Sequence, residues 1–254
     1  MQQRVFHGGL ARLGESGLVC GRTLDAAAST LEANAAMRSL ERWDTGQSYP
    51  DFLSELAKMK DGRTHLAYKN EHAIDLDTGA LLAVTVQPAA TGDTKSLPGT
   101  MEQAETNLVA IPEQAYAPEH PNSGIKEVAI DNGYHSDEIL MKYAEQGIRT
   151  YINEPKQKRN WKGKEKQKRA TQSNRRSIRG ERGKELLRRQ GELVERPFAH
   201  RMDRGRLRRL HVGGTSNVAK QELLLCAAQN RGQLMRAVYG AAPCGGKRRS
   251  GDPV

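Results

Sequence analysis

Acidic residues stand at separate points of a strongly basic chain. Asp131 follows the short apolar segment KEVAI, and Asp25 ends a segment, residues 18–25, that we expect to be a strand. Glu192 and Glu195 stand on a later segment with helical spacing. Carboxylates at the ends of separate strands and helices can hold two hard cations about 3.5–4 Å apart. During phosphoryl transfer these cations activate the attacking oxygen and stabilise the leaving oxygen. The pattern favours a metal-dependent enzyme, although composition alone does not prove such a site.

The charge of the chain points to a polyanionic partner. Its 254 residues include 40 Lys and Arg against 30 Asp and Glu, a formal net charge of +10, and 37% are hydrophobic, enough for a folded core. We therefore expect nucleic acid as the partner. The chain has neither a long apolar run nor a signal-peptide pattern, so we expect no membrane partner and a cytoplasmic, nucleoid-associated protein. Its three cysteines lack CxxC spacing, so we expect no structural zinc site and no disulfide.

The middle of the chain predicts a sheet flanked by helices. HLAYKNEHAIDLDTGALLAVTVQPA predicts a hairpin with its turn at residues 77–79. A helix over 94–110 follows, and then a strand over 126–130. Ser136 is placed to cap the next helix, and 148–152 predicts another strand. Strand, helix and strand imply a parallel pair, so we expect an α/β fold built on a mixed sheet.

The two ends of the chain predict further helices. A helix through Ala33, Met37 and Leu40 is expected after the first strand. One apolar helical stripe is formed near the C-terminal end by Leu187, Val194, Phe198 and Met202. A last helix is predicted over residues 217–239.

Residues 156–189 supply most of the excess positive charge and hold hardly any large apolar side chains, so this stretch is not expected to build a core. Its strong sign bias favours contact with a DNA backbone over a merely solvated loop. Trp161 fits two roles, stacking on an extruded base or anchoring the stretch on the core. The candidate DNA-binding residues are Arg159, Trp161, Lys162, Lys164, Lys166, Lys168, Arg175 and Arg176.

Simpler interpretations compete with some of these assignments. Asp131 could only form a turn with Gly133, and Glu195 could be a solvated helix residue. Asp75 and Asp77 are explained as strand-end and turn residues, and we leave them out of the site. Three histidines, His72, His135 and His200, are not needed as acid–base groups in two-metal chemistry. Asp93 is expected to cap the helix that follows it.

Four segments together resemble one family. KMKDGRTHLAYKNEHAIDLDTGALLAVTVQPAATGDT, EVAIDNGYHSDEIL, RTYINEPKQKRNWKGK and ELVERPFAH…LRRLHVGGTSNVAKQELLLCAAQNRGQLMR are similar to successive blocks of bacterial insertion-sequence DDE transposases. They cover nearly the whole chain, from Val5 to Tyr239. The resemblance implies an RNase H-like core with a basic insertion before its last helices. It also implies that the partner is double-stranded DNA and that the chain can form a homo-oligomer. The implied cofactor is two Mg²⁺ ions, for which Mn²⁺ can substitute.

The resemblance implies three catalytic, metal-binding carboxylates. Asp131 matches the second and Glu195 the third, with Glu192, one turn earlier, as the competing residue. The position of the first holds Ala27, while Asp25 lies two residues upstream and would point to the same side of a strand, so Asp25 is our candidate for the first carboxylate. The family often has Lys after the second Asp, where this chain has Asn132, and a longer linker between the equivalents of Leu56 and Lys58. We therefore expect a shortened, partly degenerate copy with weak or no cleavage activity.

These patterns divide the chain into five parts. They are the N-terminal part of the core (1–62), the central core (63–155), the basic insertion (156–189), the C-terminal core helices (190–240) and a disordered tail (241–254). The predicted function is that of a transposase which binds element ends and cleaves and joins DNA with Mg²⁺. Two alternatives stay open: an inactive DNA-binding remnant, and a non-enzymatic basic RNA-binding protein.

Overall fold

A computed structural model gives the structure of the protein. It describes residues 1–33, 56–58, 64–113, 116, 124–156, 159–204, 209–210, 212 and 214–240. Within these ranges the side chains of 56–58, 65, 194–204 and 209 are not described. The predicted tail, 241–254, lies outside the described residues, as do Met37 and Leu40 of the first predicted helix.

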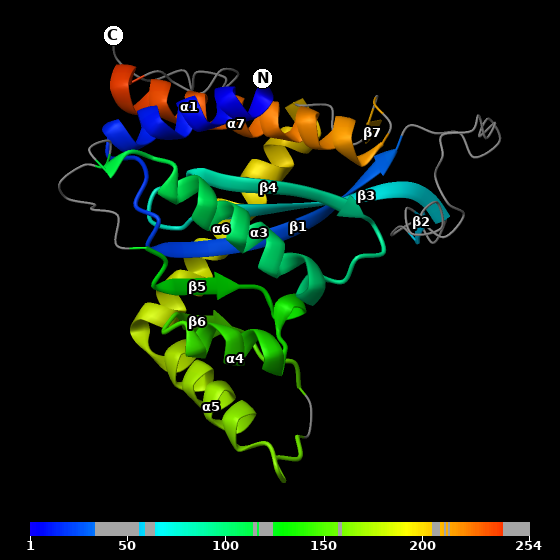
Figure 1. Cartoon of the computed structure of the whole chain (residues 1–254), viewed down its shortest axis with the longest axis vertical. Helices are drawn as coiled ribbons and strands as arrows, with labels where there is room; N and C mark the ends of the chain where they lie inside the picture. The colour runs from blue at the N-terminus through cyan, green and yellow to red at the C-terminus, as the bar shows by residue number, and fades with distance from the viewer. Residues whose placement is uncertain are drawn as a thin grey trace, which may run out of the picture.

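A mixed sheet runs through the centre of the molecule (Figure 1). Its main strands are β1 (Thr23–Ala33), β3 (Thr64–Asp75), β4 (Leu81–Pro88), β5 (Glu127–Ile130) and β6 (Arg149–Ile152). They lie in the order β4–β3–β1–β5–β6. The pairs β1–β3 and β3–β4 are antiparallel, whereas β1–β5 and β5–β6 are parallel. Short strands β2 (Leu56–Lys58) and β7 (Arg209–Leu210) extend β3 and β1. The predicted α/β class and mixed sheet are confirmed.

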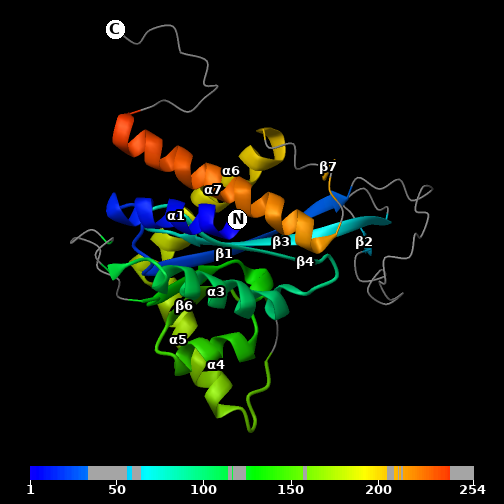
Figure 2. The same cartoon turned by 45° about the horizontal axis from the view of Figure 1, so that its top comes forward.

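Helices cover both faces of the sheet (Figure 2). They are α1 (Gln2–Glu15), α3 (Asp93–Val109), α4 (Asp137–Glu145), α5 (Glu165–Arg179), α6 (Glu181–Arg204) and α7 (Thr215–Tyr239), together with the 3₁₀ helix η3 (Asn132–Tyr134). Side chains of α3 contact Glu71 of β3, while α7 contacts His72, the next residue, which points to the opposite face. Helix α6 crosses the same face as α7, against β1, β5 and β6. We call this side, covered by α6 and α7, the α6–α7 face.

The hairpin turn forms as predicted, and Asp75 organises it. The Asp75 carboxylate accepts hydrogen bonds from the backbone N–H of Asp77 at 2.9 Å and from the Thr78 hydroxyl at 2.9 Å. It also accepts the backbone N–H groups of Cys20 at 2.7 Å and Gly21 at 3.0 Å, so it ties the segment before β1 to the turn. These bonds explain the burial of Asp75 and assign it a structural role.

Asparagine side chains complete both outer strands of the sheet. The Asn230 amide of α7 accepts from the Leu81 N–H at 3.0 Å and donates to the Leu81 carbonyl at 2.8 Å. Asn174 of α5 makes the same pair of bonds with Ile152 of β6, at 3.0 and 2.8 Å. An outer strand would otherwise expose unpaired backbone groups. These amides therefore satisfy the backbone groups of Leu81 and Ile152 on the outer strands β4 and β6.

The start of the chain differs from the prediction. Residues 18–25 do not form a strand that ends at Asp25; β1 begins at Thr23 and continues to Ala33, so Ala33 is in a strand and not in a helix. Alanine favours helices, but here pairing with β3 over nine positions outweighs that propensity. Helix α1, missed from the sequence, precedes β1 and buries Phe6, Leu10 and Leu13.

The basic stretch 156–189 is also more ordered than expected. It contains α5, which packs on α4 and β6 and buries Ala170, Thr171 and Asn174, so the expectation that this stretch contributes nothing to a core is wrong. Small and polar residues suffice because the amide of Asn174 bonds the sheet edge. Helix α6 continues across the division expected at residues 189 and 190. Within the described part of α6, Leu186 is fully buried, whereas Leu187 of the predicted stripe is half-buried.

Other local expectations are confirmed. Helix α3 covers the stretch predicted over 94–110, and the Ser136 hydroxyl caps α4 by accepting the Ile139 N–H at 3.1 Å. Asp93 does not cap α3: Gly92 holds the N-cap position, and Asp93 pairs instead with the Lys69 ammonium at 2.5 Å. The buried positive charge of Lys69 therefore replaces the backbone as the partner of Asp93.

Candidate active site

The pairing of β1 with β5 brings Asp25 and Asp131 to one side of the sheet. Asp25 and Ala27 both point to the α6–α7 face, since Asp25 pairs with Ile74 and Ala27 with His72. Leu24 pairs with Val128 in the parallel register, and three residues further on along each strand Ala27 lies level with Asp131. Asp25 lies two residues before Ala27, and therefore about 6.6 Å back along β1 from the position beside Asp131.

Asp25 is fully buried under α6. Its Oδ1 accepts a hydrogen bond from the Gln190 amide at 3.3 Å, and Oδ2 accepts none from the described residues. Burial raises the pKa of Asp25 well above its usual range, the backbone N–H of Ala26 opposes this, and the negative charge of Asp131 raises the pKa further. A buried carboxyl with an unsatisfied oxygen beside a second carboxylate is suited to a cation, because a cation compensates both charges.

Asp131 is exposed and directly follows β5. Its Oδ1 accepts the backbone N–H of Asn132 at 2.7 Å and so caps η3. The Asp131 side chain thus makes a local contact with Asn132, and not the predicted turn contact with Gly133. This bond occupies one carboxylate oxygen and holds the side chain at the strand end, where a phosphodiester can approach.

A buried hydroxyl network fixes the segment that carries Asp131. The Tyr134 hydroxyl, at the end of η3, donates to Glu71 Oε1 at 2.8 Å, and Ser96 Oγ donates to the same oxygen at 2.7 Å. Thr100 donates to the other oxygen of Glu71. Burial, followed by the charge and hydrogen bond of Glu71, raises the pKa of Tyr134 far above its usual range, so the hydroxyl keeps its proton and remains a donor.

Lys69 supplies the positive charge of this network. Its ammonium lies 3.7 Å from Glu71, 2.5 Å from Asp93 and 5.9 Å from the centre of the Tyr134 ring. Asp93 in turn lies close to Gly133, where a Cβ atom would come within 2.9 Å of its Oδ2. These positioning residues could not be recognised in the sequence. The tyrosine three residues after Asp131 was the available signal, but its partner is 63 positions away in the chain.

Helix α6 brings the remaining candidates across the sheet. Leu186 and Leu193 pack on Ala129 and Tyr151, and Gln190 between them reaches Asp25. Glu195 lies on α6, but its side chain is outside the described part, so its distance from Asp131 stays a prediction.

Glu192, the competing residue, is on the described part of α6. Its side chain is 53% exposed, and its carboxylate pairs with Arg188, one turn earlier, at 2.7 Å. An exposed i,i+4 pair accounts for this glutamate without a metal.

The start of α6 is anchored by a buried polar group. The Arg182 guanidinium donates to Glu127 Oε2 at 3.0 Å, and the Tyr151 hydroxyl donates to Glu127 Oε1 at 2.6 Å. Burial pushes the pKa of Glu127 upward, but the bonds from Tyr151 and Arg182 outweigh it and hold the pKa below its usual range. Because Glu127 begins β5, this contact sets the position of α6 relative to the strand that leads to Asp131.

Arg159, Trp161 and Arg175, among the candidate DNA-binding residues, have contacts with other elements of the fold. Arg159 is 15% exposed and binds Glu154 at 2.8 Å and Asp137, and its guanidinium lies 5.5 Å from the centre of the Trp161 ring. Arg175 donates two hydrogen bonds to the same Glu154, at 2.6 and 2.9 Å. Arg175 thus ties α5 to the segment after β6, and Arg159 ties the segment before α5 to the start of α4. The contact of Arg159 with the Trp161 ring fits the anchoring role of Trp161.

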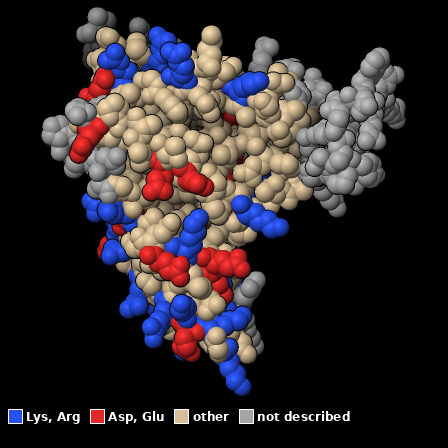
Figure 3. Space-filling view, in the orientation of Figure 1, with Lys and Arg blue, Asp and Glu red and all other residues tan. Residues whose placement is uncertain are grey.

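The remaining candidates are available to solvent. Lys162, Lys164, Lys166 and Arg176 are exposed, and Lys168 is half-exposed. In Figure 3 many Lys and Arg side chains lie at the end of the molecule formed by α4 and α5, mixed with Asp and Glu. This end can contact a phosphate backbone through the lysines, while the arginines that pair with Glu154 hold α5 in place.

The sheet order, with two parallel strands beside an antiparallel hairpin and helices on both faces, defines an RNase H-like α/β protein with carboxylates at adjacent strands. The family model for the transposase DDE domain matches residues 39–231. The chain therefore belongs to the DDE transposase family, and its general function is that of a transposase. The matched range contains Asp131 and Glu195 but begins after β1, so it includes neither Asp25 nor Ala27.

The other comparisons add nothing to this assignment. No curated protein and no solved structure matches the chain. Among the described residues, no helix is long and apolar enough to cross a membrane.

Proposed function

We propose that this chain binds the ends of an insertion element and catalyses Mg²⁺-dependent cleavage and joining of DNA. Asp25, Asp131 and Glu195 are the proposed ligands of two Mg²⁺ ions, with Mn²⁺ able to substitute. The observation that carries the proposal is the β1–β5 pairing, which sets Asp25 beside Asp131 on the face crossed by the helix of Glu195. The buried, unsatisfied Oδ2 of Asp25 fits a cation at this place.

The residues around the site have different roles in this proposal. Asp131 is exposed and meets the DNA backbone, while Asp25 supplies a second carboxylate from beneath α6. Tyr134 and Glu71 keep the strand end in place, and Gln190 orients Asp25. Two bound Mg²⁺ ions supply the activation of the attacking oxygen and the stabilisation of the leaving one. Water attacks first and the freed 3′ hydroxyl second, as the family resemblance implies.

The same geometry supports weak activity. Ala27, and not Asp25, is level with Asp131, so the first carboxylate reaches the site from about 6.6 Å further back along β1. An inactive DNA-binding remnant is therefore the second candidate function.

A nicking assay decides between the two functions. The full chain is incubated with supercoiled DNA that carries the element ends, with Mg²⁺ or with a chelator. We expect slow nicking that requires Mg²⁺ and is lost in Asp131→Ala, while Glu105→Gln, which changes an exposed carboxylate of α3 on the opposite side of the sheet, nicks at the wild-type rate. Binding of the DNA with no nicking under any condition would establish the remnant. Nicking that is unaffected by Asp131→Ala would contradict the DDE site.

A further inference from the structure

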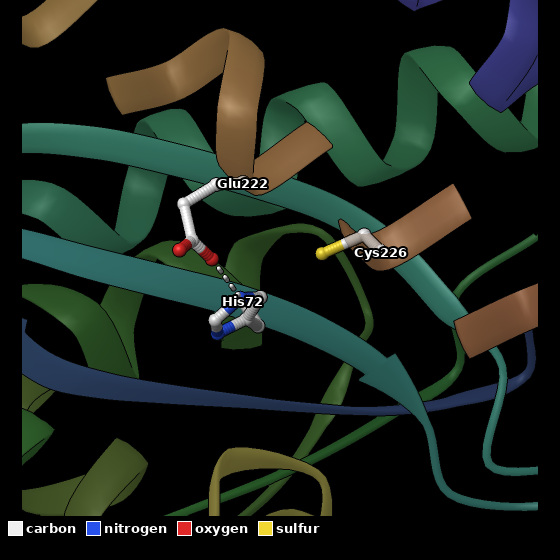
Figure 4. Close-up of side chains that lie close together, drawn as sticks. All are labelled: His72, Glu222 and Cys226. Carbon is white, nitrogen blue, oxygen red and sulfur yellow. Dashed lines mark ion pairs between the residues drawn. The ribbon is translucent and has the colours of Figure 1, made fainter. Parts of the chain in front are cut away.

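A second cluster of ligand-type side chains lies on the α6–α7 face, and it does not include Asp25 or Asp131 (Figure 4). His72 comes from β3, and Glu222 and Cys226 come from successive turns of α7, with their side chains directed at the imidazole. All three residues are fully buried, with 0% exposure. One ligand atom from each lies within 4.8 Å of the other two.

The Glu222 carboxylate is buried between an amide and an imidazole. Its Oε2 accepts a hydrogen bond from the Asn70 amide at 2.5 Å, and His72 Nε2 lies 3.7 Å from the same oxygen. Burying a carboxylate is costly unless a cation compensates it. A divalent ion with one carboxylate, one thiolate and one neutral imidazole gives a net charge of zero. A protonated His72 beside a neutral Cys226 also gives zero, and this is the competing arrangement.

The donor set distinguishes between metals. Mg²⁺ prefers an all-oxygen shell, whereas nitrogen, sulfur and oxygen together suit Zn²⁺ and its close relatives. Two ligand atoms about 2.1 Å from one tetrahedral zinc ion lie about 3.4 Å apart. The observed 3.7 Å between His72 Nε2 and Glu222 Oε2 is close to that value.

We propose that His72, Glu222 and Cys226 bind one zinc-class transition-metal ion that fastens α7 to β3. Asn70 holds the carboxylate in position, as outer-shell donors do around metal ligands. The three ligands leave one tetrahedral position, which a water molecule would fill, and because no ligand is exposed to solvent we assign the ion a structural role. It lies beside the catalytic strand, since His72 pairs directly with Ala27 of β1. This proposal does not depend on the DNA chemistry.

Cobalt is the probe for this site, because Co²⁺ accepts the same ligands and absorbs light when a thiolate binds it. The full-length chain is refolded with Co²⁺ and excess Mg²⁺, dialysed, and measured for absorbance and for metal per chain. We expect one Co²⁺ per chain, a thiolate-to-cobalt absorption band, and its loss when Zn²⁺ is added. Wild-type protein that folds without binding Co²⁺ would overturn the proposal in favour of the histidine–glutamate pair.

The three cysteines provide matched controls. Cys226→Ser should lose the thiolate band, whereas Cys20→Ser, which changes another buried thiol, and Cys244→Ser should keep it. Circular dichroism checks that each variant folds. A band that survives Cys226→Ser in folded protein, or that disappears in a folded Cys20→Ser or Cys244→Ser protein, would place the metal elsewhere and contradict the assignment.

Discussion

Two groups of potential metal ligands share the α6–α7 face, and their surroundings differ. Asp25 and Asp131 offer only oxygen, and Asp131 is open to solvent. His72, Glu222 and Cys226 offer nitrogen, oxygen and sulfur and are fully buried. An open oxygen site suits an exchangeable hard ion that must meet DNA, whereas a closed mixed site suits a retained ion that holds helices together. Burial and donor type thus separate reactive from structural sites on one sheet.

The largest expected effect concerns Glu195, the third proposed carboxylate of the open group, which consists of Asp25, Asp131 and Glu195. Glu195→Gln should lower Mg²⁺-dependent nicking by on the order of 10²-fold or more, because it removes a proposed metal ligand. Glu192→Gln is the matched control one turn earlier, and it should change only the surface pair with Arg188. Initial rates of nicking with saturating DNA measure both. A large loss in Glu192→Gln with none in Glu195→Gln would exchange the two assignments.

DNA contact should depend on the exposed lysines near α5 and not on the buried cluster. Changing Lys162, Lys164, Lys166 and Lys168 to Gln should make the log–log slope of duplex affinity against salt less negative by up to about 3.6, at about 0.9 per lost contact. Lys95→Gln with Lys220→Gln, two exposed lysines on other helices, should leave the slope nearly unchanged. An unchanged slope in the fourfold variant would place the DNA path elsewhere.

The closed group, which consists of His72, Glu222 and Cys226, should contribute to the free energy of unfolding. Asn70→Ala removes the donor to Glu222 and leaves a buried carboxylate less satisfied, so it should lower the free energy of unfolding by about 1–3 kcal/mol. Asn217→Ala, at the exposed start of α7, should cost much less. Urea unfolding of both variants measures the difference, and equal losses would mean that the Asn70–Glu222 contact contributes nothing specific.

Asp25 should produce the smallest effect, and it depends on pH. Because the pKa of Asp25 is raised in the folded chain, its contribution to stability is greatest at low pH and is lost as pH rises from its unfolded value, about 3.9, through the folded value. The melting temperature of Asp25→Asn should therefore be higher than that of the wild type at pH 7. This gap, the variant's melting temperature minus that of the wild type, should narrow towards pH 4. Thermal melts across this range check the sign. A gap that widens towards pH 4 would mean that Asp25 is stabilised as an anion.

Local patterns explain which parts of the fold could be predicted. The hairpin around residues 77–79 and the cap at Ser136 depend on neighbouring residues, and both are confirmed. The alanine-rich start of β1 could not be predicted in this way, because its strand conformation comes from β3, more than forty residues later.

The candidate sites divide in the same way. Asp131 could be found because it follows a clear apolar strand. The Tyr134–Glu71 contact and the cluster of His72, Glu222 and Cys226 join residues far apart in the chain, and isolated cysteines gave no spacing to recognise. Only the folded arrangement reveals them, because sheet pairing and helix packing decide which distant side chains meet.

The position of the first carboxylate can be tested directly with Ala27→Asp. Ala27 is level with Asp131, so a carboxylate at this position should complete the open site and raise Mg²⁺-dependent nicking by on the order of 10²-fold over wild type. Ser29→Asp adds the same charge one step further along the same face and should give no gain. A large gain in Ala27→Asp alone is the predicted result. Rapid nicking by the unmodified chain that persists in Asp25→Ala, with no gain from Ala27→Asp, would contradict it.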